Sequence, residues 1–275
     1  MNKKLFILAL ALVGVSAFSF QTKAEESAKG ISLEVGADIV SSYLWRGMNL
    51  GGISIQPSVT LDWKGLYVSG WANIGADNWT FEDINPELDI TIGYDNYGLQ
   101  VDLTHLYYFG GDAYFPRNGF KAQPHLSPDS CGSTMEAHAG FHLGDLVEDV
   151  PLTIDWYTTI YGADCYQDEN DEWKRAWSTY IELGYDFDLG EDWILAARVG
   201  MTPAKSLYTG FKGNFAVMLA GTKLTKSWSL ACGTVSAFAH VMLQPWNVNK
   251  NNLILPITAA RGQKLSLAVG CSYEI

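Results

Sequence analysis

The sequence predicts an all-β fold: a transmembrane antiparallel up-and-down β-barrel of about twelve strands, preceded by a cleaved signal peptide. Three observations predict it. Apolar residues recur at every second position, which is the period of a strand with one apolar face. Short connections alternate with mostly longer ones, as in barrels with periplasmic turns and external loops. Aromatic residues gather at the strand ends, where a bilayer meets water.

The composition fits this fold class and excludes others. The chain is 48% hydrophobic and only 17% charged, with a formal net charge of −12. This is too apolar for a disordered chain. The acidic balance argues against a nucleic-acid partner, because binding phosphates needs clustered Lys and Arg. No run of 18 apolar residues follows the N-terminal segment, so the sequence predicts no transmembrane helix there.

Residues 1–24 have the three parts of a secretory signal peptide. Lys3 and Lys4 form a basic start, residues 5–20 are apolar, and 22–24 offer a small-residue cleavage site. Three of the 18 basic residues and none of the 30 acidic ones lie in this segment, so the remaining chain carries about −15. Residues 25–275 are then expected to form one barrel domain in the outer membrane of a Gram-negative bacterium.

In the first half of the chain, alternation defines six strands. Residues 31–39, 88–94, 99–103 and 135–143 place apolar side chains at every second position. Two-residue connections at 64–65 and 96–97 indicate tight turns. The expected strands are 31–46, 53–63, 66–75, 86–95, 98–109 and 134–144.

The second half repeats this pattern. Residues 152–156 and 265–275 alternate clearly, whereas 213–224 and 228–243 carry apolar residues at both parities. The expected short turns are 145–150, 188–191 and 225–227, and the loops 163–175, 203–212 and 244–263 are longer. The expected strands are 151–162, 176–187, 192–202, 213–224, 228–243 and 264–275.

The first hairpin resembles a known family. Residues 38–47 contain a Ser-x-Tyr-x-x-Arg-Gly-like element, Pro57 follows, and 65–71 match a Gly-[Phe/Tyr]-Tyr-x-x-x-Trp-like second hairpin. This stretch is similar to the TorF-type porin family of bacterial outer-membrane β-barrels, although Gln56 precedes the proline where the family has Gln after it. The resemblance implies a channel without a defined substrate. The matching positions are Tyr43, Arg46, Gly47, Pro57, Gly65, Tyr67 and Trp71.

Polar positions of the strands are expected to face the lumen. Carboxylates dominate them, which favours cations. We therefore expect a porin-like channel for the passive diffusion of small solutes, with a preference for cations. The alternative is that these acids pair with Arg, Tyr or His groups and fill a non-conducting structural or ligand-binding barrel. The candidates are Glu34, Asp38, Arg46, Asp89, Asp102, Glu136, His138, His142, Asp155, Glu182, Asp186 and Arg198.

No metal, cofactor or enzymatic activity is expected. His138 and His142 share a strand face, but four residues of strand separate them by about 13–14 Å, too far for one ion. An outer-membrane lipid-modifying enzyme would need a Ser–His pair. The only His-x-Ser sequence is His125-Leu126-Ser127, between Pro124 and Pro128 in a predicted loop.

The four cysteines leave two disulfides open. Cys131 and Cys165 both fall in predicted external loops, and Cys232 and Cys271 fall on the last two predicted strands. An exported protein allows oxidation, but sequence alone does not establish the geometry. The expected partners are outer-membrane lipids, small solutes or ions, and the barrel-assembly machinery through the C-terminal strand.

Overall fold

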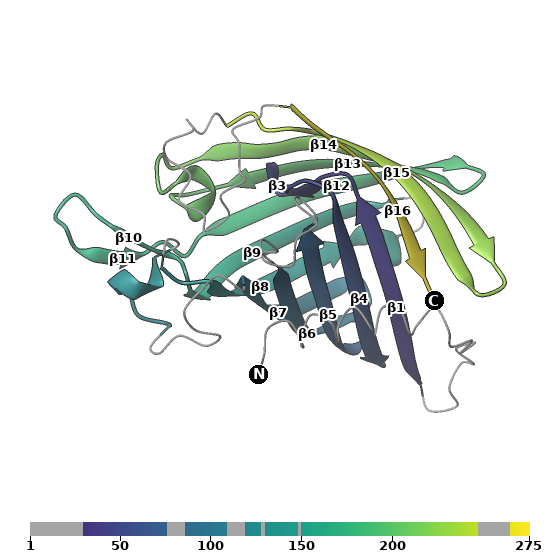
Figure 1. The fold of residues 1–275 in the computed structure, drawn as a ribbon, viewed down its shortest axis with the longest axis horizontal. Coiled ribbons are helices and arrows are strands. Elements are labelled where there is room, and N and C mark those ends of the chain that lie inside the picture. Colours follow the sequence, from purple (N-terminus) through teal and green to yellow (C-terminus); the bar gives the residue numbers. More distant parts are fainter. Residues whose placement is uncertain (1–29, 76–85, 109–118, 128–129, 148–149, 247–264) are drawn as a thin grey trace.

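The computed structural model describes residues 30–75, 86–108, 119–127, 130–147, 150–246 and 265–275. Within these ranges, twelve strands form one closed antiparallel barrel, in which consecutive barrel strands are neighbours (Figure 1). Strands β1 and β16 pair with each other and close it. The all-β up-and-down barrel predicted from the sequence is therefore confirmed, while the predicted signal peptide at 1–24 lies outside the described residues.

Most barrel strands begin and end within a few residues of the predicted limits. They are β1 (Ile31–Val40), β4 (Ser54–Trp63), β5 (Leu66–Gly75), β6 (Glu87–Asn96), β7 (Leu99–Tyr108), β8 (Ser133–His142), β9 (Leu152–Gly162), β12 (Thr179–Gly190), β13 (Trp193–Thr202), β14 (Ala216–Leu230), β15 (Gly233–Leu243) and β16 (Leu265–Glu274).

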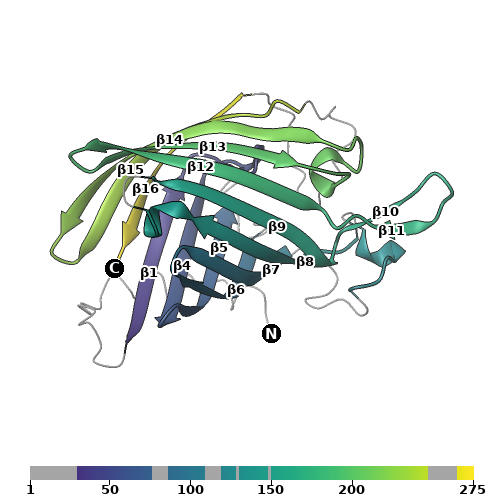
Figure 2. The same ribbon diagram turned by 180° about the vertical axis from the view of Figure 1, so that it is seen from behind.

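Smaller elements lie in the connections. They are the hairpins β2 (Tyr43–Trp45) with β3 (Met48–Gly51) and β10 (Cys165–Gln167) with β11 (Trp173–Arg175), and the 3-10 helices η1 (Pro124–Leu126), η2 (Leu143–Asp145) and η3 (Leu207–Thr209). Figure 2 shows β10 and β11 projecting beyond the ends of β8 and β9. In the described part of the chain, no helix has the length and apolarity needed to cross a bilayer.

The outward face of the barrel is apolar. Leu33, Ile92 and Leu267 are 51%, 61% and 63% exposed, and many other outward Leu, Ile and Val side chains resemble them. Exposed apolar surface costs about 25 cal/mol per Å² in water, so a belt of this extent is unfavourable unless an apolar phase covers it. Trp63 and Trp193 are also exposed and flank short turns, as in an interfacial aromatic girdle.

Short turns join alternate pairs of strands. In the β4–β5 turn, Lys64 and Gly65 have φ values of 56° and 89°, and in the β12–β13 turn, Glu191 and Asp192 have 51° and 59°. Two consecutive left-handed residues are typical of type I′ hairpins, whose twist matches that of the flanking strands. At Gly65 a side chain is also excluded, because a Cβ would lie 2.6 Å from a backbone oxygen of the β6–β7 hairpin.

The structure corrects three of the strand, turn and loop assignments predicted from the sequence. The predicted strand 31–46 ends at Val40, after which the chain folds back as β2 and β3. The predicted turn 225–227 is strand, because β14 continues to Leu230 and pairs with β15. Cys232 therefore lies in the β14–β15 turn and not on a strand. The predicted loop 163–175 contains the β10–β11 hairpin.

Candidate functional site

The segment 41–51, which includes β2 and β3 and is called the inner hairpin below, folds into the barrel interior. At its tip Arg46 and Gly47 have φ values of 45° and 84°, so both adopt the left-handed conformation. A Cβ on Gly47 would lie 1.9 Å from the carbonyl oxygen of Met218 on β14. The tip therefore touches the backbone of the barrel wall, and only glycine fits there.

Apolar side chains pack the inner hairpin against one side of the wall. Met48 and Leu50 are 2% and 5% exposed and belong to one buried cluster with Tyr180 on β12 and Met218 on β14. On the other side, Tyr43 lies against Trp71 of β5, with ring centroids 5.6 Å apart. The inner hairpin thus contacts opposite walls and fills part of the cross-section.

Arg46 anchors the inner hairpin through a buried ion pair. Its two terminal nitrogens donate to Glu136 of β8 at 2.6 and 2.7 Å, and Nη1 also donates to the Tyr208 hydroxyl at 2.5 Å. The Arg46 and Glu136 side chains are only 8% and 9% exposed. The rings of Tyr157 and Tyr180 lie 4.0 and 4.9 Å from the guanidinium carbon. A bidentate pair with aromatic neighbours compensates the loss of hydration of this charge.

A second polar group joins three neighbouring strands. His138 on β8 lies between Asp102 on β7 and Asp155 on β9, with Nδ1 to Oδ2 and Nε2 to Oδ1 distances of 2.7 and 3.0 Å. Tyr67 donates to Asp102 at 2.8 Å, and Tyr157 stacks on the His138 ring at 4.2 Å. Both ring nitrogens can donate only in the protonated imidazole, so the geometry fits a cation between two carboxylates.

Arg198 of β13 forms a third group with two acids of β12. Its Nη1 donates to Asp186 at 2.5 Å, and its Nε lies 3.8 Å from Glu182. Tyr180 donates a hydrogen bond of 2.8 Å to the same Glu182 carboxylate. Three clusters of paired charge therefore occupy the β7–β9 and β12–β13 side of the lumen.

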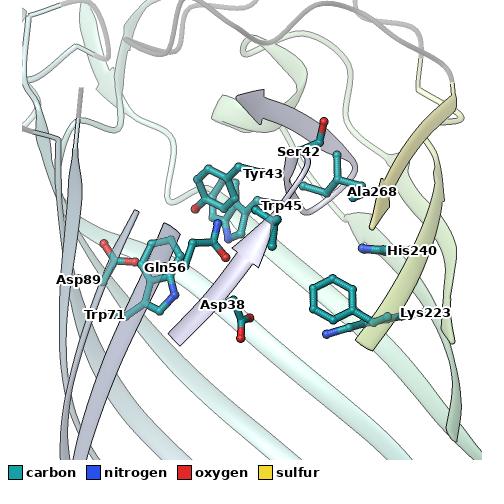
Figure 3. Close-up of a pocket in the computed structure, with 13 residues that line it drawn as sticks. Asp38, Ser42, Tyr43, Trp45, Gln56, Trp71, Asp89, Lys223, His240 and Ala268 are labelled. Atoms are coloured by element: carbon teal, nitrogen blue, oxygen red, sulfur yellow. The ribbon is translucent and has the colours of Figure 1, made fainter. Parts of the chain in front are cut away.

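A polar cavity of about 410 Å³ lies beside the inner hairpin, on the side of β1, β4–β6 and β14–β16 (Figure 3). Asp38 of β1 and Asp89 of β6 contribute carboxylates to its lining. Lys223 of β14 and His240 of β15 are register partners on neighbouring strands, and both side chains line the cavity. The amine of Lys223 lies 4.0 Å from the ring centroid of Phe238. Asp38 lies beside Lys223, and Asp89 lies at the far side of the cavity (Figure 3).

The structure places the residues predicted for the lumen as follows. Glu34 is exposed on β1, near the end that carries the short turns. Asp38 and Asp89 line the cavity. The paired groups contain Arg46 with Glu136, Asp102 with His138 and Asp155, and Glu182 and Asp186 with Arg198, while His142 Nε2 lies 3.7 Å from Asp155.

The family-like residues fall into two sets. Tyr43, Arg46 and Gly47 belong to the inner hairpin. Trp71 contacts the inner hairpin through Tyr43, and Tyr67 donates a hydrogen bond to Asp102. Gly65 lies in the β4–β5 turn, and Pro57 on β4 stands opposite Ala37 of β1.

Lys223 and His240 line the cavity but were not among the candidates. Their strands carry apolar residues at both parities, so the alternation does not show which residues point inward. The signal that remains is two basic side chains in adjacent apolar segments, which lipid-facing positions would not tolerate.

The described residues hold no cluster of three His, Cys, Asp or Glu side chains arranged to bind a metal ion. The His125-Leu126-Ser127 sequence forms η1 and its C-cap, with Leu126 buried. The Ser127 hydroxyl is 2.8 Å from the hydroxyl of Ser130, with which it shares a hydrogen bond.

No disulfide joins any of the four cysteines in the structure. Cys131 and Cys165 are buried in one cluster with Leu126, Cys232 is exposed in its turn, and Cys271 is exposed on the outward face of β16. We expect all four thiols to react with a maleimide in urea without reductant. In the folded protein in detergent, a water-soluble maleimide should modify Cys232 first. Only two reactive thiols after denaturation would instead indicate a disulfide.

A buried carboxyl outside the barrel strands predicts a pH effect on the external loop 163–178. Burial raises the pKa of Asp164 to about 6, above its ordinary 3.8, even though the Ser178 amide and hydroxyl donate to it at 3.0 and 2.5 Å. The folded loop therefore favours the protonated acid. The contribution of the Asp164 carboxyl to the stability of the folded loop is fully present below about pH 4 and is lost as the pH rises through 6.

We expect backbone amides of this loop to be better protected from hydrogen exchange at pH 4.5 than at pH 7.5, after correction for intrinsic rates. Asp164→Asn should remove this difference. Glu169→Gln, at an exposed residue of the same loop, should preserve it. Protection that increases with pH in the unmodified protein would contradict the assignment.

No protein-family model matches the chain, and no curated protein does. Among solved structures, it is similar to a NanC porin, with 11% identity and a TM-score of 0.47 over 89% of this chain and 100% of that one. It is also similar to Salmonella typhi OmpF in complex with daunomycin, with 10% identity and a TM-score of 0.39 over 89% of this chain and 97% of that one. For the Pseudomonas putida toluene transporter TodX, the identity is 9% and the TM-score is 0.37 over 94% of this chain and 93% of that one. Likeness at this level does not carry an argument about function, and the TorF-type resemblance stays a prediction.

Proposed function

We propose that this chain is an outer-membrane, porin-like channel for the passive diffusion of small solutes. A closed barrel leaves no unpaired strand edge in lipid, and its exposed apolar belt suits the hydrocarbon region. The observation that carries the proposal is the polar cavity of about 410 Å³ beside the inner hairpin. It provides a hydrophilic space within a barrel whose outside is apolar.

We further propose a preference for cations. Inward acids on the described strands outnumber inward bases, even after the ion pairs are counted. An excess of fixed negative charge in a low-dielectric channel concentrates cations and repels anions. The acids are Asp38, Asp102, Glu136, Asp155, Glu182 and Asp186, and the basic groups are Arg46, His138, Arg198 and Lys223.

Planar-bilayer recordings in a salt gradient test both parts. We expect single-channel conductance and a reversal potential on the cation side. Asp38→Asn should weaken the cation preference, whereas Asp188→Asn, at an exposed site near the β12–β13 turn, should not. A protein that inserts without conducting contradicts the channel, and a reversal potential on the anion side contradicts the charge argument alone.

A non-conducting, ligand-binding barrel is the second candidate. The packing of Met48 and Leu50 against Tyr180 and Met218 favours it, because the inner hairpin fills part of the interior. The same recordings separate the two functions, since only the channel carries current.

A further inference from the structure

We infer that the cavity beside the inner hairpin is a binding site for a neutral, polyhydroxylated solute of monosaccharide size. The inference rests on the proposed function, in which this cavity belongs to the route of diffusion, and it names the class of solute. Two features of the lining carry it. They are a run of polar side chains along one arc of the wall and the aromatic ring of Trp71 beside the start of that run.

The polar run follows neighbouring strands of the barrel. The strand order β4, β1, β16, β15 and β14 brings four polar side chains of the lining together along this arc: Gln56, Asp38, His240 and Lys223 (Figure 3). Asp38 and Gln56 are register partners, as are His240 and Lys223. Directly opposed side chains of a strand pair are close. A solute in the cavity therefore meets polar groups from both strand pairs.

Opposite charges in this run offset each other, which favours a neutral solute. Asp38 lies beside Lys223, and neither side chain makes an ion pair or a hydrogen bond with another described residue (Figure 3). His240 is favoured as the neutral imidazole, because it stands opposite Lys223 and like charges there repel each other. A hydroxyl group donates to Asp38 and accepts from Lys223 without adding a charge of its own.

Gln56 keeps an acceptor for a second hydroxyl group. Its amide nitrogen lies 3.4 Å from the Ser54 hydroxyl and 3.0 Å from the Asn73 side-chain oxygen, and donates to both. These contacts leave the amide oxygen, which accepts no hydrogen bond from the part of the chain that the structure describes. Figure 3 shows the Gln56 side chain pointing into the cavity. A solute hydroxyl there would supply the missing donor.

Trp71 provides an aromatic surface beside Gln56. It lies on β5, diagonally from Gln56, because its register partner is Ser58. Its ring makes a tilted contact with Tyr43 at 5.6 Å, and no other ring or cation of the described residues lies over it. One side of a sugar ring is lined by C–H groups, which pack on the negative face of an aromatic ring. The hydroxyl groups at the rim of the sugar then reach the polar run.

The small side chain of Ala268 on β16 leaves room for the solute. Ala268 lines the cavity and is the register partner of His240 on β15. A larger side chain at this position would project into the cavity. The volume of about 410 Å³ lies within the range of small-molecule sites and accommodates a monosaccharide.

The test measures equilibrium binding by saturation-transfer NMR, with the full barrel folded in a detergent that has no sugar headgroup. The neutral ligands are the methyl glycosides of D-glucose, D-galactose and D-mannose. The charged analogues are cationic D-glucosamine and anionic D-glucuronate. We expect at least one neutral glycoside to bind with a Kd of about 1 mM or below. Neither charged analogue should bind more than about tenfold more tightly, because each meets a like charge in the polar run.

Variants of the lining locate the site. Ala268→Leu should weaken binding of the neutral glycoside at least about tenfold, because the larger side chain occupies the cavity. Its matched control is Ala239→Leu, on the outward face of β15, which should bind as the unmodified protein does. Trp71→Ala should weaken binding about tenfold, whereas Trp71→Phe, which keeps an aromatic face, should retain most of the affinity.

A second pair of variants tests the polar run. Lys223→Met should weaken binding of the neutral glycoside about three- to tenfold, the range of one hydrogen bond. Lys226→Met is the matched control, because Lys226 lies near the short-turn end of β14 and contacts Asp192. Its affinity for the glycoside should equal that of the unmodified protein.

No binding of any neutral glycoside, or binding that persists unchanged in a folded Ala268→Leu barrel, would overturn the inference. A charged analogue that binds more than about tenfold more tightly than the neutral glycosides would assign the cavity to ions and overturn it as well. If a variant does not fold, the comparison of ligands on the unmodified protein still decides. Equilibrium binding needs no current. Conductance without glycoside binding therefore contradicts only the inferred site, and glycoside binding without conductance contradicts only the channel.

Discussion

Replacing Gly47 by Ala is expected to displace the inner hairpin and raise the single-channel conductance several-fold. The added Cβ would overlap the Met218 carbonyl oxygen at 1.9 Å. The residue would also need a left-handed backbone, with φ of 84° here, which costs an L-residue about 1–2 kcal/mol. Because the hairpin tip and the β14 backbone cannot both remain in place, the tip has to move away from the wall.

Gly51→Ala provides the control for this prediction. Gly51 belongs to the same hairpin, but the nearest atom to an added Cβ is the Tyr43 Cβ at 3.9 Å, an ordinary contact. Its conductance should match that of the unmodified protein in planar bilayers. If Gly47→Ala also leaves the conductance unchanged while the barrel remains folded, the inner hairpin does not limit the passage.

Replacing Glu136 by Gln is expected to destabilise the folded barrel by about 3–5 kcal/mol, because it leaves the Arg46 guanidinium buried without its counter-charge. Arg46 is 8% exposed and makes both of its carboxylate contacts to this one residue. The loss should appear as a lower midpoint in urea unfolding in lipid bilayers. The conductance should also rise, since the ion pair holds the inner hairpin to β8.

Replacing both partners separates the ion pair from the packing. Arg46→Met combined with Glu136→Leu removes both charges together, and such exchanges of a buried pair are often close to neutral. The double variant should therefore be more stable than Glu136→Gln alone. A single variant that unfolds at the same urea concentration as the unmodified barrel would show that Tyr208 and the surrounding rings suffice to hold Arg46.

The strand pattern could be predicted because it depends on local chemistry. A strand with one face toward lipid must alternate, so residues such as Leu33 and Val35 on β1 identify its outward face without any tertiary information. Type I′ turns likewise depend on a few adjacent residues, such as Lys64 and Gly65. At β14, apolar residues at both parities concealed the continuation of the strand to Leu230.

The candidate site was predictable only in its residue types. Glu136, Asp102 and Asp155 could be assigned to the lumen by alternation, but their partners could not. The alternative that the lumen acids pair with Arg or His groups holds for these three, which contact Arg46 or His138 in the folded protein. The basic side chains that line the cavity, Lys223 and His240, come from strands whose inward parity the sequence left undefined.

Local periodicity, set by the backbone geometry of a strand, was enough to establish a closed up-and-down barrel of twelve strands with an apolar exterior. The path of residues 41–51 and the pairing of the lumen charges required the tertiary structure. Arg46 meets Glu136 and Tyr208 across 90 and 162 residues of chain. Only the register of the strands around the closed barrel determines such encounters, because it sets which inward side chains share one level of the lumen.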